Sequence, residues 1–262
     1  MAYDAHLHLD GYPEARRDAL LGEAFAGGVA GVVAVSMDVA SCEVNRAWAR
    51  RYPGRVMPAY GHHPEQPPLG EAALAALCDW IRARAADGEP FAVGEVGLPY
   101  YTRTEAEAKG EPFDETPYAR QLDRFVALAA ELDRPIALHA VYEDAGKALD
   151  LLERRGIRRA HFHWFKGDSR TVDRIVANGY CLSLTPDVRY EPEIRALAAA
   201  VPLERLMAET DGPWPFEGPY AGRETHPLMA ADVAAEIARL RGLAPEAVAR
   251  ILDANTRSFY GF

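Results

Sequence analysis

Six residues of the types that bind metal ions are spread along the chain, each next to a short β-rich segment. His6 and His8 come first, two positions apart in the run Asp4-Ala5-His6-Leu7-His8. Because side chains alternate faces along a strand, this spacing directs both imidazoles to one side, at a separation suited to one ion. The other candidate ligands are Glu95, His139, His163 and Asp211. A His-x-His pair alone is a weak signal, but the full set at strand ends predicts a metal centre.

Two carboxylates in this set are candidates for catalysis as well as for metal binding. Glu95 follows a predicted buried strand, where an unpaired acid is costly, and its place between the two halves of the set suits a carboxylate that bridges two ions. A solvated loop glutamate is the alternative. Asp211 ends the last predicted strand, where it can act as general base toward a metal-activated water; a helix N-cap is its alternative.

Several histidines and tryptophans have more than one possible role. His163 is preferred over His161 because it stands at the strand's end before a glycine-containing turn, whereas His161 lies deeper, as a core imidazole or a support for a ligand. His63, in Gly61-His62-His63-Pro64, is predicted to bind substrate or to support a ligand, with an ordinary turn histidine as the alternative. Trp164 and Trp214 are predicted to be packing residues or pocket walls.

Eight β-rich segments, each followed by a helical pattern, must position these residues. Apolar positions such as Leu122, Phe125, Val126 and Ala129 recur at i, i+3, i+4 and i+7, and a closing helix is predicted after Pro245. The predicted strands are Ala2–His6, Gly31–Ser36, Val56–Tyr60, Phe91–Val93, Ile136–Leu138, Ala160–His163, Tyr180–Leu184 and Leu206–Glu209.

This count is that of a (β/α)8 TIM barrel, and the candidate ligands stand at the carboxyl ends of strands, where barrel enzymes build their active sites. A doubly wound open sheet is the alternative, but no glycine-rich dinucleotide turn follows the first strand. No internal boundary is evident, so residues 1–262 are predicted to form a single domain. The least regular stretch, Tyr100–Pro117, is predicted to be a lid or binding loop, with a disordered segment as the alternative.

Composition limits the partners. The net charge of −10 and the absence of a basic block argue against a protein that coats duplex DNA. No apolar run approaches the ~20 residues of a membrane span, and no signal peptide is evident. The 3 cysteines are odd in number and far apart, which favours idle thiols in a reducing compartment, and a cytoplasmic location is expected.

Seven segments resemble, in order and spacing, the TatD family of metal-dependent hydrolases in the amidohydrolase superfamily. The resemblance implies a TIM barrel, a site for one or two metal ions, and hydrolysis, usually as a deoxyribonuclease acting as a 3′→5′ exonuclease. It also implies that His6, His8, Glu95 and Asp211 bind one ion, and Glu95, His139 and His163 the second. The segments are Asp4–His8, Gly61–Pro64, Gly94–Leu98, Pro135–His139, His163–Gly167, Glu209–Asp211 and Asn255–Tyr260.

The chain departs from the family pattern around the substrate. The family usually has His-x-Arg after the fifth strand, whereas this chain has His139-Ala140-Val141 and lacks that phosphate-binding arginine. Lys166 or Arg189 is a candidate replacement. With His63 and Trp214, Lys166 completes the predicted substrate-binding set. The chain is thus expected to be a divergent subgroup.

The expected reaction is hydrolysis by a water that one or two divalent ions activate, with Asp211 and Glu95 as the catalytic carboxylates. Mixed nitrogen and oxygen ligands admit zinc, manganese, magnesium or nickel. The first hypothesis is a phosphodiesterase acting on single-stranded DNA ends. The second is a hydrolase of a lactone, an amide or a small phosphoester, which the missing arginine favours. The third is a metal-binding scaffold without turnover.

Overall fold

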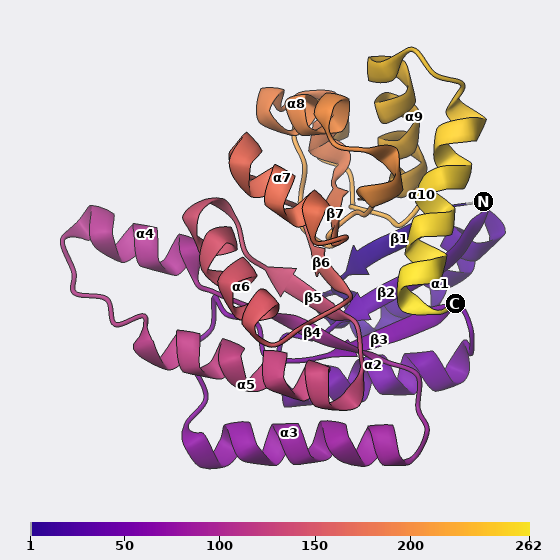
Figure 1. The fold of residues 1–262 in the computed structure, drawn as a ribbon. Helices are drawn as coiled ribbons and strands as arrows, with labels where there is room; N and C mark the ends of the chain where they lie inside the picture. The colour runs from indigo at the N-terminus through magenta and orange to yellow at the C-terminus, as the bar shows by residue number, and fades with distance from the viewer. Residues whose placement is uncertain (1) are drawn as a thin grey trace.

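The chain folds into one sheet of eight parallel strands that alternate with helices (Figure 1). A computed structural model describes residues 2–262. The strands follow one another in chain order, each hydrogen-bonded to the next, so the predicted barrel is confirmed and the open doubly wound sheet is wrong. The strands are β1 (Ala2–Leu7), β2 (Val29–Val35), β3 (Val56–Tyr60), β4 (Ala92–Gly97), β5 (Ile136–His139), β6 (Ala160–Phe162), β7 (Cys181–Leu184) and β8 (Leu206–Ala208).

Backbone hydrogen bonds beyond the ends of β8 join it to β1 and close the sheet. The Asp211 N–H donates to the His6 carbonyl at 2.9 Å, and the His8 N–H donates to the Gly212 carbonyl at 2.8 Å. These bonds form a seam between the beginning and the later part of the chain. The same seam brings the candidate ligands of β1 and β8 together.

Helices cover the outside of the barrel (Figure 1). The predicted apolar spacing in α5 is confirmed, because Leu122, Phe125, Val126 and Ala129 are all buried there. The helix that begins at Pro245 is confirmed as well. Within residues 2–262, no helix is both long enough and apolar enough to cross a bilayer. The helices are α1 (Glu14–Ala26), α2 (Val39–Arg51), α3 (Glu71–Ala86), α4 (Tyr100–Lys109), α5 (Thr116–Leu132), α6 (Tyr142–Arg154), α7 (Ser169–Ala177), α8 (Pro192–Ala200), α9 (Met229–Arg241) and α10 (Pro245–Tyr260).

The barrel interior changes from apolar to polar along the strands. Cys181 and Met207 belong to an apolar cluster that also includes Tyr260 from the end of α10. Two positions after these residues come Ser183, in β7, and Glu209, directly after β8, and both are fully buried. The polar end of the interior is therefore the carboxyl end of the strands, where the candidate ligands stand.

The stretch Tyr100–Pro117 is mostly helical, so its prediction as an irregular loop or a disordered segment is wrong, while its role as a lid stays a prediction. α4 occupies most of it and ends at Gly110, whose φ of 71° is the left-handed conformation that glycine adopts without steric cost. Arg103 of α4 is only 9% exposed and lies 3.2 Å from the buried carboxylate of Asp144 in α6. An anchor of this kind is an ion pair between distant segments, and hydrophobic periodicity does not reveal it.

Glu95 lies inside β4 and not after a strand, as the sequence had suggested. The ladder between β4 and β5 is irregular between Val93 and Val96, and the Glu95 side chain is fully buried. The flanking glycine had resembled a turn residue. Instead, Gly97 allows a close approach of strands, because a Cβ there would lie 1.9 Å from the His139 carbonyl oxygen. The other predicted strand ends lie within two residues of the observed ones.

Candidate metal centre

Glu95 stands at the centre of the site, and its two oxygens face different imidazoles. Oε2 lies 3.0 Å from His6 Nε2 and 3.1 Å from His8 Nε2. Oε1 lies 2.6 Å from His163 Nε2 and 3.0 Å from His139 Nδ1. One carboxylate thus divides the candidate ligands into two groups, as a bridging carboxylate would.

Asp211 completes the first group. Its Oδ1 lies 3.4 Å from His6 Nε2 and 3.3 Å from His8 Nε2. The turn after β8 holds it, with the Trp214 N–H donating to the Asp211 carbonyl at 3.1 Å. Asp211 has a φ of 50°, a conformation that costs a non-glycine residue about 1–3 kcal/mol and that is found preferentially at functional sites.

His139 and His163 form the second group with Glu95. His139 Nδ1 and His163 Nε2 are 3.3 Å apart, and both face Oε1 of the carboxylate. His63 lies beside them, with Nε2 3.4 Å from Glu95 Oε1 and its ring centroid 4.8 Å from that of His139. The structure therefore places His63 against the metal-ligand candidates, at the position of a further ligand or a support.

The separations fit metal coordination. Two ligand atoms that each lie about 2.0–2.2 Å from an ion are about 3.0–3.5 Å apart at tetrahedral or octahedral angles. The first group has separations of 3.0, 3.1, 3.3 and 3.4 Å. Asp211 Oδ1 is also buried without a hydrogen-bond partner among the described residues, and a cation would compensate that cost. The imidazole and carboxylate donors suit zinc, manganese, magnesium or nickel.

Charge in the metal-free centre follows from burial and pairing. Burial favours the protonated form of Glu95, but the neighbouring charge of His163 and the other imidazoles outweighs it and holds the Glu95 pKa well below its usual value. Burial favours neutral His8, but the adjacent carboxylates of Asp211 and Glu95 raise its pKa to about 10. Burial lowers the pKa of His6, so not every imidazole is protonated, but without metal His8 carries a proton that a cation must displace in order to bind.

Glu65 supports the second group, and sequence reasoning missed it. Its Oε1 lies 3.1 Å from His139 Nε2, the ring nitrogen opposite the one that faces Glu95. The Tyr101 and Thr102 N–H groups at the start of α4 donate to Glu65 at 2.9 and 2.7 Å. Burial raises the Glu65 pKa, but hydrogen bonds from His139 and Thr102 lower it to about 2. The carboxylate fixes the ring orientation of His139, as supporting residues do in metal sites.

Glu209 lies below the centre and was also missed as a site residue. It is fully buried, and its Oε1 accepts the Trp164 N–H at 2.5 Å and lies 3.7 Å from His163 Nδ1. Its Oε2 accepts the Ser183 hydroxyl at 2.5 Å. The available signal was strand parity, because Glu209 is two positions before Asp211 and so shares its face.

His161 continues this buried chain of hydrogen bonds, and its prediction as a core or supporting imidazole is confirmed. Its Nε2 is 2.6 Å from Ser183 Oγ, and its Nδ1 is 2.6 Å from the Tyr260 hydroxyl. Burial, followed by the charge of His6, holds the His161 pKa well below its usual value, so the ring is neutral. Since Ser183 donates to Glu209, His161 Nε2–H donates to Ser183, and the Tyr260 hydroxyl donates to His161 Nδ1.

Of the predicted substrate-binding residues, His63 lies at the metal centre, whereas Lys166 and Trp214 lie in a cavity beside it. Lys166 and Trp214 line a cavity of about 300 Å³ beside the centre, and Lys166 Nζ lies 4.8 Å from the centroid of the Trp164 ring. Trp214 is 58% exposed, as a pocket wall would be. Arg189, the other candidate for the missing phosphate contact, lies over the Tyr220 ring at 5.6 Å and is not among the residues that line this cavity.

The chain is similar to known proteins over nearly its whole length. The family model described as "TatD related DNase" matches residues 3–261. An "Uncharacterized metal-dependent hydrolase" of Haemophilus influenzae is 35% identical over 262 residues, which cover 99% of each chain. A "3'-5' ssDNA/RNA exonuclease TatD" of Cronobacter sakazakii is 30% identical over 93% of this chain and 91% of the other. The crystal structure of the TatD homologue YjjV from Escherichia coli superposes with a TM-score of 0.81 and 27% identity, covering 100% of this chain and 98% of the other.

Proposed function

Because the chain belongs to the TatD family and is a metal-dependent hydrolase, we propose that it hydrolyses phosphodiester bonds and removes nucleotides from the 3′ end of single-stranded nucleic acid. The observation that carries this proposal is the division of the ligands by Glu95 into two groups that share one carboxylate. Two ions held in this way suit displacement at phosphorus. The relative named as a 3′-5′ exonuclease supports the choice of bond.

We assign one ion to His6, His8, Glu95 and Asp211, and a second to Glu95, His139 and His163. When bound, such ions lower the pKa of a water molecule and polarise the phosphoryl oxygen. Because Glu95 belongs to both groups, its carboxylate fixes their positions relative to each other. The Asp211 carboxylate, which lies beside His6 and His8, would also accept the proton of the attacking water and return it to the leaving oxygen.

We infer that a strand end, and not a duplex, is the substrate. The side chains of His8 and Asp211 are 14% and 9% exposed, so only a small part of the centre faces solvent. The net charge of −10 does not favour extensive contact with a duplex backbone. The three cysteines are buried and free, which supports a location in the reducing cytoplasm.

One observation favours a second candidate, a hydrolase of a small phosphoester or of a lactone or amide. The position two after His139 is Val141, which is 3% exposed and carries no charge. The cation nearest in sequence to His163 is Lys166, and it lies among carboxylates in the cavity beside the centre. Such a site holds one small substrate more readily than a long polyanion.

The test is hydrolysis of a 5′-labelled single-stranded oligonucleotide by protein loaded in turn with manganese, magnesium, zinc and nickel. A metal-dependent ladder that shortens from the 3′ end, and that is absent in Asp211→Asn, is the expected result. Metal binding without cleavage, together with turnover of a small phosphoester or lactone, would replace the first candidate with the second.

A further inference from the structure

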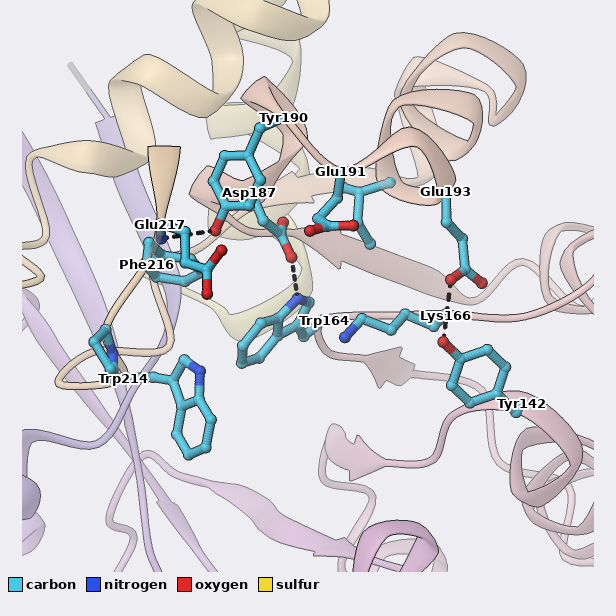
Figure 2. Close-up of a pocket in the computed structure, with 12 residues that line it drawn as sticks. Tyr142, Trp164, Lys166, Asp187, Tyr190, Glu191, Glu193, Trp214, Phe216 and Glu217 are labelled. Atoms are coloured by element: carbon cyan, nitrogen blue, oxygen red, sulfur yellow. Dashed lines mark hydrogen bonds between the residues drawn. The ribbon is translucent and has the colours of Figure 1, made fainter. Parts of the chain in front are cut away.

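Aromatic side chains form much of the lining of the cavity beside the metal centre. Figure 2 shows aromatic rings on several sides of it, with Trp164 in the middle. The Trp164 ring centroid is 6.0 Å from that of Trp214 and 5.6 Å from that of Phe216. Tyr190 contributes a further ring to the lining. Flat aromatic walls of this kind accommodate a flat ring by stacking or edge contact.

The loops that carry the candidate metal ligands also supply residues that line the cavity. Trp164 directly follows His163, and Trp214 comes three positions after Asp211 and donates its N–H to the Asp211 carbonyl. The Tyr142 N–H donates to the Lys166 carbonyl at 2.7 Å, so the loops after β5 and β6 are also joined at this cavity. A substrate whose scissile bond lies at the centre therefore has its neighbouring group within reach of the cavity.

The polar groups of the cavity are mainly hydrogen-bond acceptors. Its lining includes four carboxylates and the single ammonium of Lys166. Asp187 is occupied by the Trp164 indole N–H at 2.7 Å, and Glu193 by the Tyr142 hydroxyl at 3.1 Å. The carboxylates of Glu191 and Glu217 are directed toward the same space as Trp164 and Lys166 (Figure 2). These two carboxylates remain as acceptors for a ligand.

We propose that this cavity is a specificity site for a flat aromatic ring that carries exocyclic amino groups, which in a nucleotide end is adenine, cytosine or guanine. This rests on the proposed function. An amino group donates to a carboxylate, whereas a carbonyl oxygen placed there would meet like partial charge. Uracil and thymine present carbonyl oxygens where cytosine and adenine present amino groups. The excess of carboxylates over the one lysine disfavours a phosphate in the cavity.

The binding test uses cytidine and uridine, because neither carries a phosphate and neither requires the metal centre. Calorimetry on the wild-type protein should show cytidine binding about tenfold more tightly than uridine. The double variant Glu191→Gln, Glu217→Gln should reduce that ratio to near one, since an amide can also donate to a carbonyl. Trp214→Ala should weaken both nucleosides. Glu71→Gln, at the exposed start of α3, is the matched control and should leave the ratio unchanged.

The activity test uses metal-loaded protein and four oligonucleotides that differ only in the 3′-terminal base. Faster removal of dA, dC and dG than of dT, narrowed in the double variant, supports the proposal. Equal rates for all four bases, or a preference for dT, overturn it while the exonuclease function stands. If no oligonucleotide is cleaved with any metal, the exonuclease function fails, and the proposal for the cavity then depends on the nucleoside binding test alone. A ratio of cytidine affinity to uridine affinity near one, or below one, overturns the proposal.

Discussion

Replacing Ser183 by alanine should destabilise the metal-free protein by about 2–4 kcal/mol. The Ser183 hydroxyl donates to Glu209 Oε2 at 2.5 Å and accepts from His161 Nε2 at 2.6 Å. Alanine leaves both groups fully buried without this partner, and each loss is worth about 1–3 kcal/mol. The total is expected below the sum of the maxima, because a water molecule in the space of the lost hydroxyl would recover part of it.

The assay is urea unfolding in the presence of a chelator, so that metal binding does not contribute. Ser36→Ala is the matched control, because Ser36 is also fully buried and accepts a neutral hydrogen bond from Asn45 Nδ2 at 3.0 Å. Asn45 Nδ2 keeps a second bond, to the Val35 carbonyl at 2.8 Å. The control should therefore lose only about 0.5–1.5 kcal/mol.

Equal losses in the two variants would refute the idea that Ser183 joins two buried polar groups. A second measurement separates support of the site from stability alone. Metal affinity should fall about 10- to 100-fold in Ser183→Ala, because Glu209 would no longer be held beneath His163, and should not change in Ser36→Ala. An unchanged affinity in Ser183→Ala would show that the buried chain does not reach the metal centre.

Three further predictions concern charge. Glu95→Gln should reduce hydrolysis to below about a thousandth while circular dichroism stays native, since the shared carboxylate is lost; substantial activity would refute the assignment. Metal affinity should rise with pH by about tenfold per unit for each displaced proton, because the His8 pKa is about 10 without metal; calorimetry that detects no proton release contradicts this. Burial raises the Asp253 pKa from 3.8 to about 6, so the folded protein retains a proton that the unfolded protein releases, and the free energy of unfolding falls as pH rises from about 4 to 6. Urea unfolding of Asp253→Asn at several pH values should lack that fall. The same pH dependence in wild-type and variant protein would contradict this prediction.

The barrel and the six candidate ligands were accessible to sequence reasoning because both depend on local pattern. Strand parity aligned His6 with His8, and the carboxyl ends of successive parallel strands meet at one face of a barrel. His161 could be set apart from His163 for the same reason, since depth in the barrel follows position along the strand.

Other features depend on packing between distant segments. Glu65 contacts His139 from the loop after β3, where the start of α4 holds its carboxylate, and no local period encodes this contact. α4 itself was missed because Arg103 anchors it through ions and not through an apolar face. The position of Glu95 within β4 was missed because Gly94 and Gly97 resemble turn residues in sequence.

The seam between β1 and β8 has a consequence for synthesis of the protein. His6 and His8 leave the ribosome early, but Asp211, which bonds to the His6 carbonyl, is made more than 200 residues later. At about 5–20 residues per second, this interval is about 10–40 s. During that time the nascent chain has two imidazoles without the carboxylate that completes their group. A chain released early therefore cannot assemble the metal centre, so hydrolytic competence is tied to completion of the barrel.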